Sequence, residues 1–134
     1  MVGRQAATRS GRSTAAWVPA RQDIVWIESN PQAGAEMRDR HPMLVLSPQA
    51  FNARTGLVIG LPMTTAPHNA TNPFALAVGA GTGRKASKTS YVLCHQPKSF
   101  DWRARKASPH PSRRLAEPAF AQACEVLNQI VALG

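Results

Sequence analysis

Histidine and cysteine are the side chains in this 134-residue sequence best suited to metal or redox chemistry, and their spacing fits neither. Cys94 and Cys124 are too few for a disulfide framework and do not form a Cys-x-x-Cys pair, so we expect reduced, buried thiols and a cytoplasmic protein. The histidines are scattered, and none pairs with a carboxylate at ligand spacing. They are His41, His68, His95 and His110. The sequence therefore predicts no metal and no cofactor, and any catalysis must come from side chains.

Two basic segments, residues 79–88 and 98–114, are expected to be loops and are suited to binding a polyanion. Residues 98–114 contain six cations with Phe100 and Trp102 among them, and Asp101 is the only acid. Aromatic rings can stack on bases while Lys and Arg hold the backbone, which favours single-stranded nucleic acid. The alternative is that Trp102 belongs to the core and the arginines form a solvated rim. Residues 79–88 are glycine-rich and basic; they lack Walker spacing, but Arg84 and Lys85 could contact phosphates.

The overall charge points in the same direction. Sixteen Lys and Arg against seven Asp and Glu give a net charge of +9. A surface with this excess suits nucleic acid first, then acidic protein segments or anionic membrane; the alternative is a solvated excess of charge without a partner. No run approaches the roughly 20 apolar residues that span a bilayer, so we expect no membrane insertion.

The chain divides into a short arm and one domain. Residues 1–21 hold four arginines, no acid and many small polar residues, so they cannot bury enough surface to fold alone. We expect a flexible basic arm whose end, Trp17-Val18, docks on the domain; an arginine-rich transit peptide has a similar composition. Residues 22–134 are long enough to form a single domain with its own core.

The domain contains short apolar runs followed by one helical segment. The runs are 24–27, 42–46, 57–63, 74–78 and 89–94. Separated by Gly, Pro and Asn, they predict a small barrel or a strongly curved antiparallel sheet. Arg54-Thr55-Gly56 is typical of a hairpin turn, and Gly60 and Pro62 of a bend or bulge. After Pro118, apolar residues at three- and four-residue spacing predict an amphipathic helix that includes Ile130 and Val131 and is capped by Gly134.

Taken in order, these segments resemble the MazF/PemK toxins of toxin–antitoxin systems. The resemblance covers about residues 22–134. It rests on Asp23-Ile24-Val25-Trp26 with Asn30-Pro31 and Gly34-x-Glu36, on His41-Pro42-Met43-Leu44-Val45-Leu46-Ser47-Pro48 with Asn52 and Thr55-Gly56, on Leu61-Pro62-Met63-Thr64-Thr65, and on Gln96-x-Lys98-Ser99 with Trp102-Arg103-Ala104-Arg105.

The resemblance implies a mainly β (α+β) fold, a small SH3-like barrel with a C-terminal helix, acting as a homodimer. It also implies a sequence-specific endoribonuclease, an mRNA interferase that cuts single-stranded RNA without a metal and leaves a 2′,3′-cyclic phosphate and a 5′-hydroxyl. The implied inhibitor is an antitoxin whose acidic, disordered tail occupies the RNA groove. Both ligands are polyanions, which agrees with the net charge of +9.

The family's active residues transfer only in part. The family pairs an arginine immediately before the proline of the second strand with the first threonine of a Thr-Thr pair, often assisted by a glutamate of the first loop. The resemblance thus implies Thr64 and Glu36 as catalytic residues. Together with the basic segments described above, it leads us to expect RNA contacts by Thr65, Arg84, Lys85, His95, Lys98, Trp102, Arg103 and Arg105.

The arginine is displaced, because the chain reads Arg40-His41-Pro42. A shift of one residue at a strand directs a side chain to the opposite face. One interpretation makes His41 the acid/base, since histidine titrates near neutral pH and arginine does not. A second lets the loop adjust so that Arg40 reaches the phosphate, and a third is an inactive toxin. His95 replaces an aspartate of some relatives and either alters base recognition or is an ordinary half-buried histidine.

Two functions of other classes compete with the endoribonuclease. One is a gyrase poison of the same fold (CcdB-like), which relies on a C-terminal Trp-Gly-Ile, whereas this chain ends Ala132-Leu133-Gly134. The other is an RNA-binding module without catalysis, supported by the basic arm and the cations around Trp102.

Overall fold

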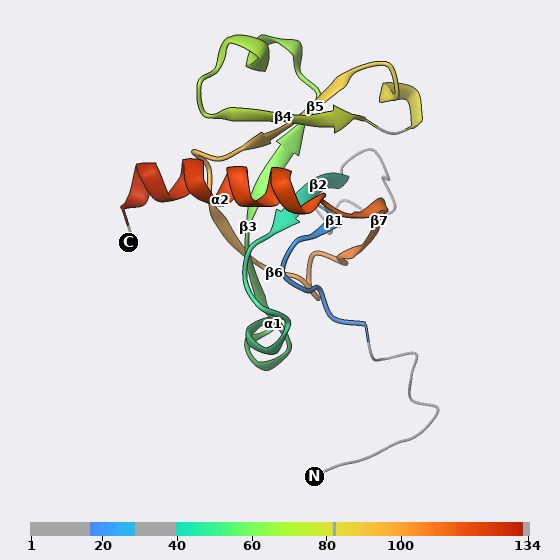
Figure 1. Cartoon of the computed structure of the whole chain (residues 1–134). Coiled ribbons are helices and arrows are strands. Elements are labelled where there is room, and N and C mark those ends of the chain that lie inside the picture. Colours follow the sequence, from blue (N-terminus) through green and yellow to red (C-terminus); the bar gives the residue numbers. More distant parts are fainter. Residues whose placement is uncertain (1–16, 29–39, 82, 133–134) are drawn as a thin grey trace.

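Seven strands form one curled, antiparallel half-barrel sheet in the computed structural model, which describes residues 17–28, 40–81 and 83–132 (Figure 1). The strand order is β4-β5-β3-β2-β1-β7, and β6 also pairs with β3. The strands are β1 Asp23–Glu28, β2 Arg40–Val45, β3 Leu57–Thr64, β4 Ala75–Ala80, β5 Thr89–Leu93, β6 Lys98–Asp101 and β7 Ser108–Arg114. The predicted curved antiparallel sheet is confirmed.

Strand β3 lies at the centre of the fold and changes partners along its length. Its first half pairs with β6, Gly60 to Pro62 pair with β2, and Met63 and Thr64 pair with β5. A Cβ atom at Gly60 would lie 2.4 Å from the carbonyl oxygen of Leu44, so only glycine allows β2 and β3 to approach this closely. At the position of the predicted bend or bulge, β3 changes its pairing partners and so connects the two halves of the sheet.

Strands β1, β2 and β3 bury side chains on both faces of the sheet, which explains why they are largely apolar. One face packs under the C-terminal helix and contains Ile24, Leu44, Leu61 and Val92 among others. The opposite face contains Val25, Val45, Val58, Phe100 and Trp102. Neighbouring residues of β1 and β2 therefore serve different cores, as the alternation of side chains along a strand requires.

Among the described residues, two α-helices accompany the sheet, and only the second was predicted. Helix α2, Glu117–Val131, runs across the sheet (Figure 1) and buries Phe120 and Ala123, as its apolar spacing predicts. The helix includes Ile130 and Val131, as predicted, and both side chains are exposed at its C-terminal end. Ala132 occupies the left-handed cap position, and the predicted cap, Gly134, lies outside the described residues.

The predicted hairpin turn before β3 is also wrong. Helix α1, Gln49–Thr55, occupies this connection and ends at Gly56, which takes a left-handed conformation with φ of 76°. Asn52 ties the helix to the sheet, because its buried amide donates to the carbonyl oxygens of Pro19 (2.8 Å) and Ser47 (3.1 Å). The segment was missed because the turn pair Ser47-Pro48 and the short helix after it have no apolar periodicity that would predict a helix.

Residues 98–114, read from sequence as a basic loop, are largely strand. They contain β6 and β7 with a turn between them. Strand β7 is at the edge of the sheet and, among the described strands, pairs with β1. An edge strand has a neighbour on one side only, so it tolerates two prolines, which lack a backbone N–H. The loop at 79–88 is shorter than expected, since β4 continues to Ala80 and a 3-10 turn, η5, occupies Gly83–Lys85.

The described end of the arm packs on the domain. Trp17 meets Trp102 edge to face, with ring centroids 6.0 Å apart, and Val18 joins the same cluster. This confirms the predicted docking of Trp17-Val18, while residues 1–16 lie outside the description. Another 3-10 helix, η4 Pro67–Thr71, joins β3 to β4.

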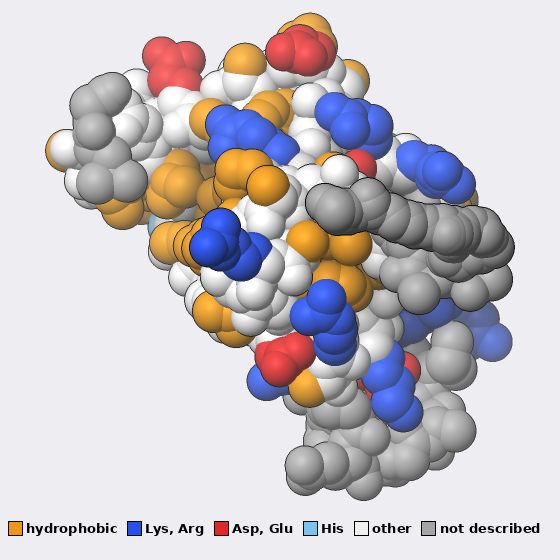
Figure 2. Space-filling view, turned by 90° about the horizontal axis from the view of Figure 1, so that it is seen from below, with side chains coloured by type: hydrophobic (Ala, Val, Ile, Leu, Met, Phe, Trp, Pro, Cys, Tyr) orange, Lys and Arg blue, Asp and Glu red, His pale blue; other side chains and the backbone are white. Residues whose placement is uncertain are grey.

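Positive charge is spread over the underside of the protein. Figure 2 shows Lys and Arg side chains spread among apolar ones on the underside, with few acidic groups between them. Within the described residues, no helix is both long and apolar enough to cross a membrane.

Candidate active site

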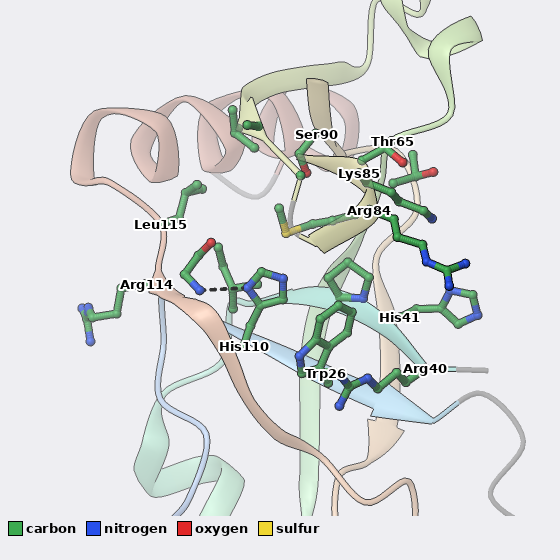
Figure 3. A pocket seen from close by; sticks show the side chains of 18 of the residues that line it. Trp26, Arg40, His41, Thr65, Arg84, Lys85, Ser90, His110, Arg114 and Leu115 are labelled. Carbon is green, nitrogen blue, oxygen red and sulfur yellow. Dashed lines mark hydrogen bonds between the residues drawn. The ribbon is translucent and has the colours of Figure 1, made fainter. Parts of the chain in front are cut away.

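A cavity of about 480 Å³ opens between the β1-β2-β7 part of the sheet and the β3-β4-β5 part (Figure 3). Its basic lining residues are Arg40, His41, Arg84, Lys85 and Arg114. Its interior is lined by aromatic, aliphatic and hydroxyl side chains from five strands. These include Ile24, Trp26, Met63, Thr64, Thr65, Val78, Ser90, His110 and Ser112. Volumes of roughly 300–1,000 Å³ are typical of ligand sites.

Arg40 reaches the cavity because of its register in the sheet. It is paired with Glu28, two residues from the Trp26–Pro42 pair, so Arg40, Trp26 and Pro42 share one face. The guanidinium carbon lies 4.4 Å from the centroid of the Trp26 ring, within cation–π distance. Strand pairing and this contact together direct the Arg40 side chain along Trp26 (Figure 3).

His41 takes the other side of the same opening. It pairs with Ile27, so the strand alternation separates it from Arg40, as the sequence predicted. The residue is exposed at the end of the strand and still lines the cavity. Its imidazole makes no hydrogen bond within the described part of the chain, so both ring nitrogens remain available to a ligand. The structure thus brings Arg40 and His41 to one site from opposite sides.

Thr64, the last residue of strand β3, and Thr65, which follows it, also line the cavity. The Thr64 hydroxyl oxygen accepts a hydrogen bond from the Ala66 backbone N–H at 3.1 Å, which leaves its proton free to donate. Thr65 abuts Gly81, where an added Cβ would lie 2.9 Å from the Thr65 methyl group and 2.6 Å from the Lys85 carbonyl oxygen. The glycine-rich loop therefore carries Arg84 and Lys85 to the cavity because Gly81 lets it pack against Thr65.

His110 and Trp26 are cavity residues that the sequence did not identify. Their ring centroids are 4.5 Å apart, and the His110 residue is only 7% exposed. The Ser112 backbone N–H donates to Nδ1 of His110 at 3.0 Å (Figure 3). Burial, together with the nearby Arg40 charge, lowers the pKa of His110, so the ring is held neutral. Pairing of β1 with β7 (Val25 opposite Pro109) joins these residues, which are far apart in sequence.

Trp102 is placed in the core and does not line the cavity. Its indole N–H donates to the Asn52 carbonyl oxygen at 2.8 Å, the residue is 7% exposed, and the Arg103 guanidinium lies 4.3 Å from the ring centroid. This corrects the expectation of base stacking, because the ring would have to leave the core to stack. The alternative considered from sequence, a core tryptophan, is the one the structure supports.

The remaining candidates are the other residues expected to bind RNA, which lie away from the cavity, and the catalytic candidate Glu36. Arg105 donates to the Glu28 carbonyl oxygen at 3.3 Å, and Lys98 is exposed on β6. His95 is half-buried, with its ring 5.7 Å from that of Phe74. Glu36 lies outside the described residues.

Two thiols, of buried Cys94 and half-buried Cys124, lie on the helix side of the sheet and do not line the cavity. Burial, with a smaller effect of Cys124, raises the pKa of Cys94 to about 11, and burial also raises the pKa of Cys124. Both are free cysteines. Across residues 17–28, 40–81 and 83–132, no three His, Cys, Asp or Glu side chains gather in a cluster that could bind a metal.

Comparison with known proteins assigns this arrangement to a family. A model of the PemK-like, MazF-like toxins of type II toxin–antitoxin systems matches residues 20–131. The endoribonuclease toxin MazF of Escherichia coli K12 is 32% identical over 92 residues, which cover 69% of this chain and 77% of that protein.

Solved structures agree with the sequence match. The crystal structure of MazF (form I) from Deinococcus radiodurans has a TM-score of 0.68 and 32% identity, over 87% of this chain and 99% of that one. A MazE–MazF crystal structure (form III) from the same organism has a TM-score of 0.70 and 30% identity, over 88% and 100%. With its curled sheet, C-terminal helix and threonine-lined cavity, the chain belongs to the PemK-like, MazF-like toxin family.

Proposed function

We propose that this protein is a toxin endoribonuclease that cleaves single-stranded RNA in the cavity between β1, β2 and β3. The observation that carries the proposal is that Arg40, His41 and Thr64, which are separated in sequence, line one cavity in a chain of the PemK/MazF family. The proposed reaction is attack of the RNA 2′-hydroxyl oxygen on the adjacent phosphorus. The bond to the 5′-oxygen breaks, leaving a 2′,3′-cyclic phosphate and a 5′-hydroxyl.

This reaction needs a group that accepts the 2′-hydroxyl proton, a group that protonates the leaving 5′-oxygen, and donors for the developing phosphorane charge. His41 is suited to proton transfer, because its ring is exposed at the opening and unbonded within the described chain. Arg40 is suited to charge stabilisation, because the Trp26 ring holds its permanently charged guanidinium in place. Thr64 is suited to donate its hydroxyl proton to a phosphate oxygen, because Ala66 already occupies an acceptor site. These roles require no metal.

Arg84 and Lys85 are proposed to hold the phosphates that flank the cut. Both are exposed on η5 at the rim of the cavity. Thr65 lies beside them and can bind the same strand. Lys98, Arg103, Arg105 and His95 lie elsewhere on the surface and are proposed to contact more distant nucleotides. Such contacts fix the RNA in register without reading its sequence.

The proposed assembly is a cytoplasmic homodimer inhibited by an antitoxin. Relatives are known in complex with MazE, so an antitoxin is the partner expected from the family. An acidic, disordered segment of that partner would compete with RNA for the cations of the rim. The homodimer would cover exposed apolar side chains of the sheet, such as Leu57 and Ile59 on β3.

Incubation of the purified protein with a long RNA in EDTA tests the proposal. The wild type should cut at few, defined positions, and a Thr64→Val variant, which keeps the shape but removes the hydroxyl, should cut far more slowly. An exposed residue outside the cavity, His68, provides the matched control as His68→Ala. Intact RNA with a folded wild-type protein would instead support a CcdB-like poison or an RNA-binding module.

A further inference from the structure

The cavity has two chemically different zones. Its exposed lining residues are mostly basic and include Arg84, Lys85 and Arg114, while half-buried Arg40 lies along Trp26. Its buried lining residues, such as Met63, Ser90 and Leu115, are uncharged, so positive charge is concentrated toward the opening. A flat, uncharged group with polar edges, such as an unstacked nucleobase, fits the interior.

His110 is the residue that gives this interior a directed polar group. Its Nδ1 accepts the Ser112 N–H, so the proton of the neutral ring is on Nε2. Within the described residues, Nε2 has no hydrogen-bond partner. It is also not one of their fully buried polar atoms that lack a partner, so it is accessible. Because His110 lines the cavity, this N–H remains available to a group that enters it.

The same hydrogen bond prevents His110 from acting as a base toward the RNA. The lone pair of Nδ1 is occupied by Ser112, and Nε2 carries the proton. Uptake of a second proton is opposed by burial and by the Arg40 charge, which lower the pKa of His110. The ring is also held in position by Trp26, whose centroid is 4.5 Å away. His110 is therefore a fixed, neutral donor.

We propose that His110 determines specificity by donating its Nε2–H to an acceptor atom of one RNA base seated inside the cavity. The base selected must present a carbonyl oxygen or an unprotonated ring nitrogen at that edge. A base with an amino group there leaves two donors facing each other, and such a mismatch costs more than the lost hydrogen bond. The inference rests on the proposed function, since it names what the interior of the proposed active site binds.

The test compares cleavage of a randomised RNA pool by the wild type, His110→Phe, His110→Gln and the control His68→Ala. Phenylalanine keeps a ring against Trp26 but has no donor, and glutamine restores an N–H. We expect His110→Phe to lower kcat/KM for the preferred sequence by about twofold to tenfold and to reduce discrimination at one position. His110→Gln should recover part of it, and His68→Ala should match the wild type.

Base analogues give a second measurement that needs no substitution. With the wild type, removal of the acceptor atom from the selected base, by a deaza or deoxo analogue, should cost the same factor, whereas His110→Phe should not distinguish the analogue. Unchanged base preference in His110→Phe, or wild-type indifference to every analogue, overturns the inference while the endoribonuclease stands. A wild type that cuts no RNA overturns both.

Discussion

Replacing the adjacent residues Arg40 and His41 separates two mechanisms that the structure assigns to different side chains. Arg40 lies along Trp26 and cannot change its charge, whereas His41 is exposed at the opening. Loss of general acid–base assistance typically costs about 10²–10⁴-fold, so His41→Ala should reduce the cleavage rate by that factor. A charged hydrogen bond contributes about 1.5–3 kcal/mol, so Arg40→Ala should cost roughly 10- to 150-fold and leave measurable turnover.

The assay is single-turnover cleavage of a short RNA with one cut site, in EDTA, as a function of pH. With His41 as the acid/base, the rate should depend on pH, and this dependence should disappear in His41→Ala. His41→Arg, which restores the family residue, should keep partial activity with a different pH profile. The result that refutes the reasoning is an inactive Arg40→Ala beside an active His41→Ala with a flat pH response.

Three further predictions concern the surroundings of these residues. Arg40 and Trp26 should be coupled: in a double-mutant cycle with Arg40→Ala and Trp26→Leu, the interaction energy should be about 1 kcal/mol, as for a half-buried cation–π pair, and a value near zero would contradict their contact. Removing Arg84 and Lys85 together should make the salt dependence of RNA binding shallower by about 1.4 in log–log slope, and an unchanged slope would place them outside the phosphate path. The lowered pKa of His110 should stabilise the fold above pH 6.5, with this contribution lost as pH falls below that value, because the unfolded chain takes up the proton first. Urea unfolding at about pH 7.5 and 5.5 should show less loss in His110→Phe than in wild type, and equal losses would contradict the assignment.

Sequence alone predicted the parts of this fold that have a periodic signal. Five apolar runs correspond to β1 to β5, and the spacing of Phe120 and Ala123 to the buried face of α2. Strands β6 and β7 were missed because they lie beside few neighbours and carry polar residues and proline. Helix α1 was missed because tertiary hydrogen bonds of Asn52, rather than an apolar stripe, hold it in place.

The candidate site was predictable where a motif preserves it and not where strand pairing assembles it. Local resemblance to the family was enough to predict Thr64 and the Arg40-His41 pair as site residues. Arg40 and His41 are adjacent on β2, so their side chains point in opposite directions, and both are candidates for a role in cleavage. His110 was dismissed as one of several scattered histidines, because only the β1–β7 pairing brings it to Trp26. Trp102 was expected to bind RNA and is instead buried in the core. The sequence could not distinguish these cases, because cations flank an aromatic residue in the same way whether its ring is buried or exposed.

A single 2′-deoxy substitution in the RNA tests the central claim most directly. The substrate is a short RNA with one mapped cut site, incubated with the wild-type protein in EDTA, and a matched RNA lacks only the 2′-hydroxyl on the 5′ side of the cut. The account predicts that the unmodified RNA yields a 2′,3′-cyclic phosphate and a 5′-hydroxyl by mass spectrometry, and that the deoxy RNA remains intact. Cleavage of the deoxy RNA at a comparable rate, or a product with a 5′-phosphate, would contradict it.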